Sequence, residues 1–117
     1  MRTAAILVAL WMLVGCSDEP SVRIIAPLPD STIVASVELR LEGHYLSATT
    51  ETKIYIDLQH YTGDLVDNTL PDECERCDFV VAFAGNSITN GMHTVAVYFF
   101  AGEEQLATDA IPVVFAR

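Results

Sequence analysis

The sequence VELRLE, residues 37–42, alternates without exception between apolar and charged side chains. In an extended chain this period of two places Val37, Leu39 and Leu41 on one face and the charged side chains on the other. One face then suits a hydrophobic core and the other suits water, as in the strands of many antiparallel sheets. We therefore predict a half-buried β-strand here, and the rest of the chain is interpreted around it.

Further strands are expected on both sides of this one. Residues 53–59 repeat the alternating pattern, so we expect Ile54, Ile56 and Leu58 to face the core. The other expected strands are 22–26, 79–83, 94–101 and 110–116. Turn-forming residues separate these stretches, and the chain after residue 21 has no stretch with a helical period. Six or seven strands at this spacing predict an all-β sandwich or barrel.

The strand expected at 94–101, TVAVYFFA, has almost no polar residues. Such a run is typical of a central strand that is covered on both faces, and this is the interpretation we favour. The alternative is a sheet with one face in water. Phe99 would then be exposed together with Val95 and Val97, in a patch of the kind that marks an interface.

Three segments carry a resemblance to a known family. IAPLPDSTI at 25–33 is similar to the opening of many bacterial immunoglobulin-like domains, and NGMHTVAV at 90–97 is similar to their penultimate strand. Ile54-Tyr55-Ile56-Asp57 stands where these domains often have V-x-V-D-G, with Leu58 in place of the glycine. The resemblance implies one immunoglobulin-like β-sandwich of about seven strands, with a role in display, adhesion or assembly. It implies no chemistry.

The N-terminus has the pattern of an export signal. Arg2 is followed by the uncharged run AAILVALWMLV at 4–14, which is shorter than the roughly 20 residues of a membrane-spanning helix. Leu13-Val14-Gly15-Cys16 resembles the lipobox of bacterial lipoproteins. The resemblance implies cleavage after residue 15, a diacylglycerol on the sulfur of Cys16 and an acyl chain such as palmitate on its amine. Ser17, in the place where Asp favours the inner membrane, implies the outer membrane.

Cleavage would leave a lipidated cysteine with a short tether, 16–21, and one domain, 22–117. The whole chain has 16 Asp and Glu against 6 Lys and Arg, and the signal peptide contains one of the six, Arg2. A surface this acidic repels nucleic acid and anionic lipid head groups, so nucleic acid is not an expected partner.

Two cysteines remain after lipidation, Cys74 and Cys77, and in an oxidising compartment they predict a disulfide. A redox-active pair is an alternative. However, a reactive thiolate needs nearby positive charge, whereas Glu73, Glu75 and Asp78 surround this pair with negative charge. A zinc site would need two further ligands, and the histidines His44, His60 and His93 could supply them only if the fold brings them together.

The segment 63–78, GDLVDNTLPDECERCD, is the most distinctive part of the chain. Connections this long are uncommon in compact domains and are often functional. Its carboxylates could contact a protein partner, or they could bind calcium, although the spacing differs from that of an EF-hand loop. The candidate contact residues are Asp64, Asp67, Asp72, Glu73, Glu75 and Asp78.

The sequence shows neither a catalytic triad nor a glycine-rich phosphate loop. We therefore expect a membrane-anchored envelope lipoprotein that is not an enzyme and needs no cofactor. It would bind an envelope protein through the acidic segment, which the disulfide stiffens. The alternatives are a calcium-stabilised spacer without its own partner and, less favoured, a thiol oxidoreductase that uses the two cysteines.

Overall fold

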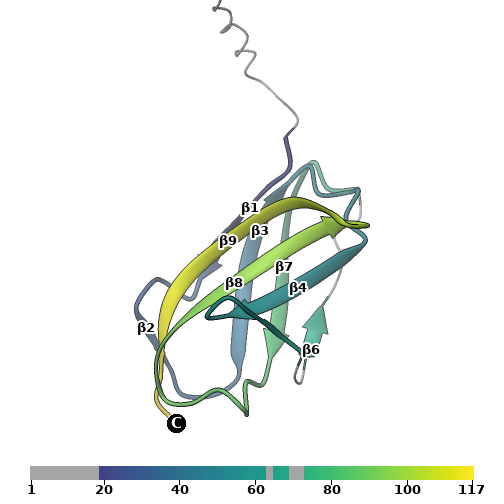
Figure 1. Cartoon of the computed structure of the whole chain (residues 1–117). Helices are drawn as coiled ribbons and strands as arrows, with labels where there is room; N and C mark the ends of the chain where they lie inside the picture. Colours follow the sequence, from purple (N-terminus) through teal and green to yellow (C-terminus); the bar gives the residue numbers. More distant parts are fainter. Residues whose placement is uncertain (1–18, 63–64, 69–72) are drawn as a thin grey trace, which may run out of the picture.

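The computed structural model describes residues 19–62, 65–68 and 73–117, and throughout these residues the regular elements are β-strands (Figure 1). This confirms the predicted all-β class. The strands are β1 (Ser21–Ala26), β2 (Ser31–Ile33), β3 (Val37–His44), β4 (Glu51–Ile56), β5 (Gln59–Tyr61), β6 (Leu65–Asn68), β7 (Arg76–Phe83), β8 (Gly91–Ala101) and β9 (Glu104–Phe115). In the same residues, no helix is long and apolar enough to span a membrane.

The strands form two sheets, one with the order β1-β3-β7-β6 and one with the order β2-β9-β8-β4-β5. The first order and the β9-β8-β4 core of the second match the ABED and GFC sheets of an immunoglobulin sandwich. The described residues contain nine strands where about seven were expected. The two extra strands are β2 and β5, which have only three residues each. β2 pairs in parallel with the end of β9, so the chain changes sheet between β1 and β2.

The core lies between the two sheets and is filled from both. Val37, Leu39 and Leu41 of β3 are at most 1% exposed, as their alternation predicted. The ring of Phe79 meets that of Phe99 edge-on, with centroids 5.4 Å apart, and so joins β7 of one sheet to β8 of the other. The largest fully buried side chains also include Phe83, Leu46, Ile54 and Phe115.

The central strand β8 presents one face to this core and one outward. Val95, Val97 and Phe99 are fully buried, so the alternative that exposed them was wrong. Tyr98 and Phe100 point to the outer face and are only half-buried. The favoured interpretation, a strand covered on both faces, was therefore wrong as well, because no second layer of the described residues covers this outer face. Tyr98 packs against Tyr55 of the neighbouring strand β4 and against Phe100 of β8 itself.

The expected inward position of Leu58 was also wrong. β4 ends at Ile56, and Asp57 and Leu58 form the two-residue turn to β5. Both have positive φ, 50° and 71°, as in the type I′ turns that match the twist of a hairpin. Leu58 therefore stands at the tip of the turn and is 84% exposed.

The two ends of the sandwich are called proximal and distal below. At the proximal end, where β1 begins, Ser21 pairs with His44, and His44 pairs with Arg76. At the distal end, Val37 pairs with Phe83, and the β4–β5 turn, the 84–90 connection and the C-terminus come together (Figure 1).

Candidate functional site

Cys74 and Cys77 form the predicted disulfide, with an S–S distance of 2.07 Å. The acidic clip, as residues 73–78 are called below, is fixed to the end of β3. The backbone N–H groups of Tyr45 and Leu46 donate to the carbonyls of Glu75 and Cys74, both at 3.1 Å. Cys74 is only 2% exposed. The disulfide is therefore part of the packed proximal end of the sandwich.

Gly43, near the end of β3, leaves room for the loop to which the clip is bonded. A Cβ atom at this position would stand 2.5 Å from Cδ1 of Leu46 and 3.4 Å from the sulfur of Cys77. The first distance is far below ordinary carbon–carbon contact. The glycine of β3 thus leaves room for Leu46 in the loop that follows it, whereas the sulfur of Cys77 would stand at ordinary van der Waals distance.

The clip holds three of the predicted contact residues on its surface. Glu73, Glu75 and Asp78 are all exposed, and none forms an ion pair within the described part of the chain. Asp67 lies in β6, opposite Ala82. Asp64 and Asp72 lie outside the described residues, as does Cys16. No group of three potential metal ligands occurs within the residues that are described.

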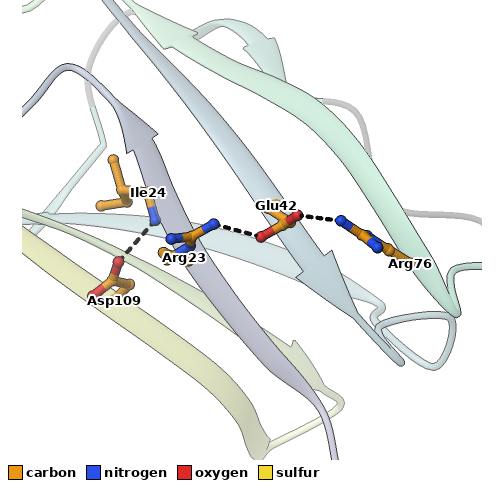
Figure 2. Close-up of polar contacts among 5 residues, drawn as sticks. All are labelled: Arg23, Ile24, Glu42, Arg76 and Asp109. Atoms are coloured by element: carbon orange, nitrogen blue, oxygen red, sulfur yellow. Dashed lines mark hydrogen bonds and ion pairs between the residues drawn. The ribbon is translucent and has the colours of Figure 1, made fainter.

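Arg76, the cation within the clip, is turned away from these carboxylates. Its guanidinium lies 3.3 Å from Oε2 of Glu42, and Arg23 donates to Oε1 of the same carboxylate at 2.8 Å (Figure 2). Hydrogen bonding from Arg23 is the main reason why the pKa of Glu42 is lowered. The row Arg23–Glu42–Arg76 crosses the outer face of β1, β3 and β7. It uses Arg76 and so leaves the clip negatively charged.

A second candidate site, the distal pocket, lies between the β4–β5 hairpin and the 84–90 connection. Its volume is about 330 Å³, at the lower end of the range of small-molecule sites. Ile56, Tyr61 and Ile88 supply its apolar lining. The polar lining consists of Asp57, Gln59, His60, Ser87, Thr89 and His93.

Asp57 and His93 form the ion pair that fixes this pocket. Nδ1 of His93 lies 2.6 Å from Oδ2 of Asp57, and its Nε2 donates to the carbonyl of Thr89 at 2.8 Å when protonated. The other oxygen of Asp57 accepts from the N–H of Thr94. The hydrogen bond from the N–H of Thr94 is the main reason why the pKa of Asp57 is lowered, and the bond from His93 is the second. The bond to Asp57 in turn raises the pKa of His93. The pair connects the hairpin turn to β8 and to the 84–90 connection.

Next to the pocket, four rings form an aromatic row on the outer face of the five-stranded sheet. His60 stacks on Tyr55 with centroids 5.4 Å apart, and Tyr55 lies 4.7 Å from Tyr98. Tyr98 in turn stacks near Phe100 at 6.2 Å. The ammonium group of Lys53 lies 5.0 Å from the centroid of Phe100, within the range of a cation–π contact. Of these residues, His60 also lines the distal pocket.

The three histidines do not gather into the zinc site that was considered. His60 and His93 both line the distal pocket, whereas His44 lies at the proximal end. The pocket and the row are sites that sequence reasoning missed. The available signal was the pair His60-Tyr61 beside the run Tyr98-Phe99-Phe100, but it becomes informative only once the strand pairing is known.

The comparisons with known proteins identify a fold and no family. No family model and no curated protein matches the chain. Among solved structures, it is similar to the endo-β-1,4-mannanase of Thermotoga petrophila, with a TM-score of 0.57 and 16% identity. The match covers 85% of this chain but only 20% of the mannanase chain. At this identity, the similarity shows a shared sandwich fold alone.

Proposed function

We propose that this chain is a lipid-anchored, non-enzymatic binding and assembly module of the bacterial outer membrane. In this proposal lipid on Cys16 holds the domain at the membrane, and the acidic segment 63–78 contacts a basic envelope protein. The observation that carries the proposal is the rigid acidic clip: its exposed carboxylates are fixed by a disulfide and by β3, and its own arginine is paired elsewhere.

Rigidity supports a contact surface because the binding partner does not have to order the loop. Association loses free energy whenever a mobile loop must be immobilised, so a preformed surface binds more tightly for the same contacts. The exposed Glu73 and Glu75 would attract a positively charged partner and speed its association. A merely solvated acidic loop needs neither a disulfide with Cys74 buried nor backbone hydrogen bonds to the loop after β3.

The position of the clip indicates where its partner should be sought. Only four residues separate Cys16 from Ser21, and the five steps along the chain between them span at most about 18 Å. Ser21, His44 and Arg76 are adjacent across the sheet. A lipid on Cys16 would therefore hold the clip near the membrane surface. We accordingly propose a partner in the same membrane, with basic residues close to the lipid head groups.

A non-enzymatic role is consistent with the chemistry of the distal pocket. A general base needs a free nitrogen or oxygen within reach of a proton on its substrate. Both ring nitrogens of His93 are engaged, one by Asp57 and one by the carbonyl of Thr89. Both oxygens of Asp57 are hydrogen-bonded as well.

The test is photo-crosslinking in living cells from a probe at Leu70, within the acidic segment, followed by mass spectrometry, in the parent and in a Glu73→Gln/Glu75→Gln variant. We expect one recurrent membrane protein to be captured from the parent, and its capture to be lost in the variant. The matched control is Glu103→Gln/Glu104→Gln, which removes the same charge from the exposed β8–β9 hairpin. It should leave the capture intact.

Equal capture from the parent and the clip variant would contradict the proposed surface. A blank from the parent, shown to be folded and lipidated, would leave the spacer alternative as the better explanation. The next measurement would then be the melting temperature with calcium and with a chelator. A rise with calcium would support the calcium-stabilised spacer, whereas an unchanged value would remove it.

A further inference from the structure

The distal pocket offers hydrogen bonds without offering charge. With His93 protonated, the two ionic groups of the pocket, Asp57 and His93, neutralise each other at 2.6 Å. Gln59 and Ser87 are exposed, and their side chains form no hydrogen bond within the described residues. An amide and a hydroxyl group that both face solvent can donate and accept. This combination suits a ligand rich in hydroxyl groups.

The aromatic row extends this site along the sheet. His60 belongs to both, because it lines the pocket and stacks on Tyr55. From there the rings of Tyr98 and Phe100 continue across β8, with neighbouring centroids 4.7 to 6.2 Å apart along the row. The pocket and the row therefore form one elongated surface from β5 to β8, with hydrogen-bonding groups at one end and rings along the rest.

The charge of this surface differs from that of the whole chain. The full chain has a net charge of −10. Along β4, β5 and β8, however, the outward-facing charged side chains are Glu51 and Lys53, whose charged groups lie 3.9 Å apart. The net negative charge of the chain repels anionic ligands. This face has no excess of carboxylates, so it does not attract a cationic ligand either. An uncharged ligand fits both observations.

We propose that the distal pocket and the aromatic row together bind a neutral oligosaccharide. A sugar ring has hydroxyl groups around its edge and C–H groups on its faces. The hydroxyl groups of a terminal sugar match Gln59 and Ser87, and the apolar faces of the following sugars match the rings of Tyr55 and Tyr98. The distal pocket lies at the opposite end from the acidic clip, and the aromatic row shares no residue with the clip, so the site goes beyond the proposed function and is independent of it.

The test is isothermal titration of the purified domain with a panel of neutral hexasaccharides that includes cellohexaose, maltohexaose and mannohexaose. We expect at least one to bind. Tyr98→Ala should weaken that binding by about tenfold, which corresponds to about 1.4 kcal/mol. Gln59→Ala combined with Ser87→Ala should weaken it separately, because these side chains contact a different sugar. The melting temperature of each variant shows whether it is folded.

Tyr45→Ala is the matched control, because it removes a tyrosine that is 37% exposed at the proximal end. It should bind the sugar as the parent does. The proposal is overturned if no neutral oligosaccharide binds at millimolar concentration, or if Tyr98→Ala binds as tightly as Tyr45→Ala. Preferential binding of an anionic sugar such as hexagalacturonate would overturn the argument from charge.

Discussion

The turn residue Leu58 gives the sharpest test of how this sequence fits its fold. It has a φ of 71° and is 84% exposed. The left-handed conformation costs a residue with a side chain about 1–2 kcal/mol, whereas glycine adopts it freely. Glycine in turn loses more backbone freedom on folding, and this costs about 0.4–1 kcal/mol relative to alanine. The difference between the strain of the left-handed conformation and the extra backbone entropy of glycine predicts which substitution at residue 58 is more stable.

We predict that Leu58→Gly is more stable than Leu58→Ala by about 0.5–1 kcal/mol. Both variants lose the same small buried part of the leucine, so this loss cancels in the comparison. At an ordinary strand position the order is reversed, because glycine is less stable than alanine by roughly 0.5–1 kcal/mol. The sign of the difference is therefore as informative as its size.

The assay is urea denaturation of the purified domain with the disulfide intact, in the parent and both variants. Equal slopes against urea concentration would show that only stability has changed. A difference of this size moves the melting temperature by about 2–8 °C in a domain of this length. If the alanine variant is as stable as the glycine variant or more so, the left-handed strain assigned to Leu58 does not exist.

Three further predictions concern stability. Gly43→Ala should lower the free energy of unfolding by about 1–3 kcal/mol, because the new methyl group meets Cδ1 of Leu46 at 2.5 Å. In a double-mutant cycle, the same substitution should cost less when Leu46 is already alanine. Strictly additive effects of the two substitutions would contradict the contact. The Asp57–His93 pair should stabilise the domain most between the ordinary pKa values of the two groups, 3.8 and 6.5. This stabilisation is lost as the pH falls through the lowered pKa of Asp57 or rises through the raised pKa of His93. The urea midpoint of Asp57→Asn should therefore vary less with pH than that of the parent. Identical pH profiles of the two proteins would show that the pair does not contribute to stability. Arg117 donates to the carbonyls of Ala35, Ala84 and Gly85, so Arg117→Ala should lower the free energy of unfolding by about 1–3 kcal/mol, and Arg117→Lys should not restore it if the planar fork is what matters.

The buried and exposed faces of a strand could be predicted from the sequence wherever apolar and polar residues alternate within that strand. In β3, alternate residues differ so strongly in polarity that only one orientation buries the apolar ones. In β8 both faces are apolar, so the pattern alone left its orientation open. The pairing of β8 with β4 and β9 decides it, and this pairing joins residues far apart in the sequence.

The turns and sites depended still more on distant residues. Leu58 is apolar and so continues the alternating pattern of β4. The folded structure shows that the strand has already ended, because Ile56 pairs with Gln59 and Asp57 is hydrogen-bonded to β8. The disulfide was predictable because Cys74 and Cys77 are three residues apart. The aromatic row was not, because its members come from three strands and meet only in the folded register.

The attachment of β1 has a mechanical consequence. This strand receives the chain at the proximal end and pairs along β3 from Ser21 to Ala26, and the N–H of Ile24 is also held by Asp109 of the other sheet at 2.8 Å (Figure 2). Tension between the N-terminus and a ligand held at the distal end would run along the strands, whereas the interstrand hydrogen bonds lie across them. Those bonds would then be sheared together instead of being unzipped one by one. A domain connected in this way resists being torn open by the pull of whatever it holds.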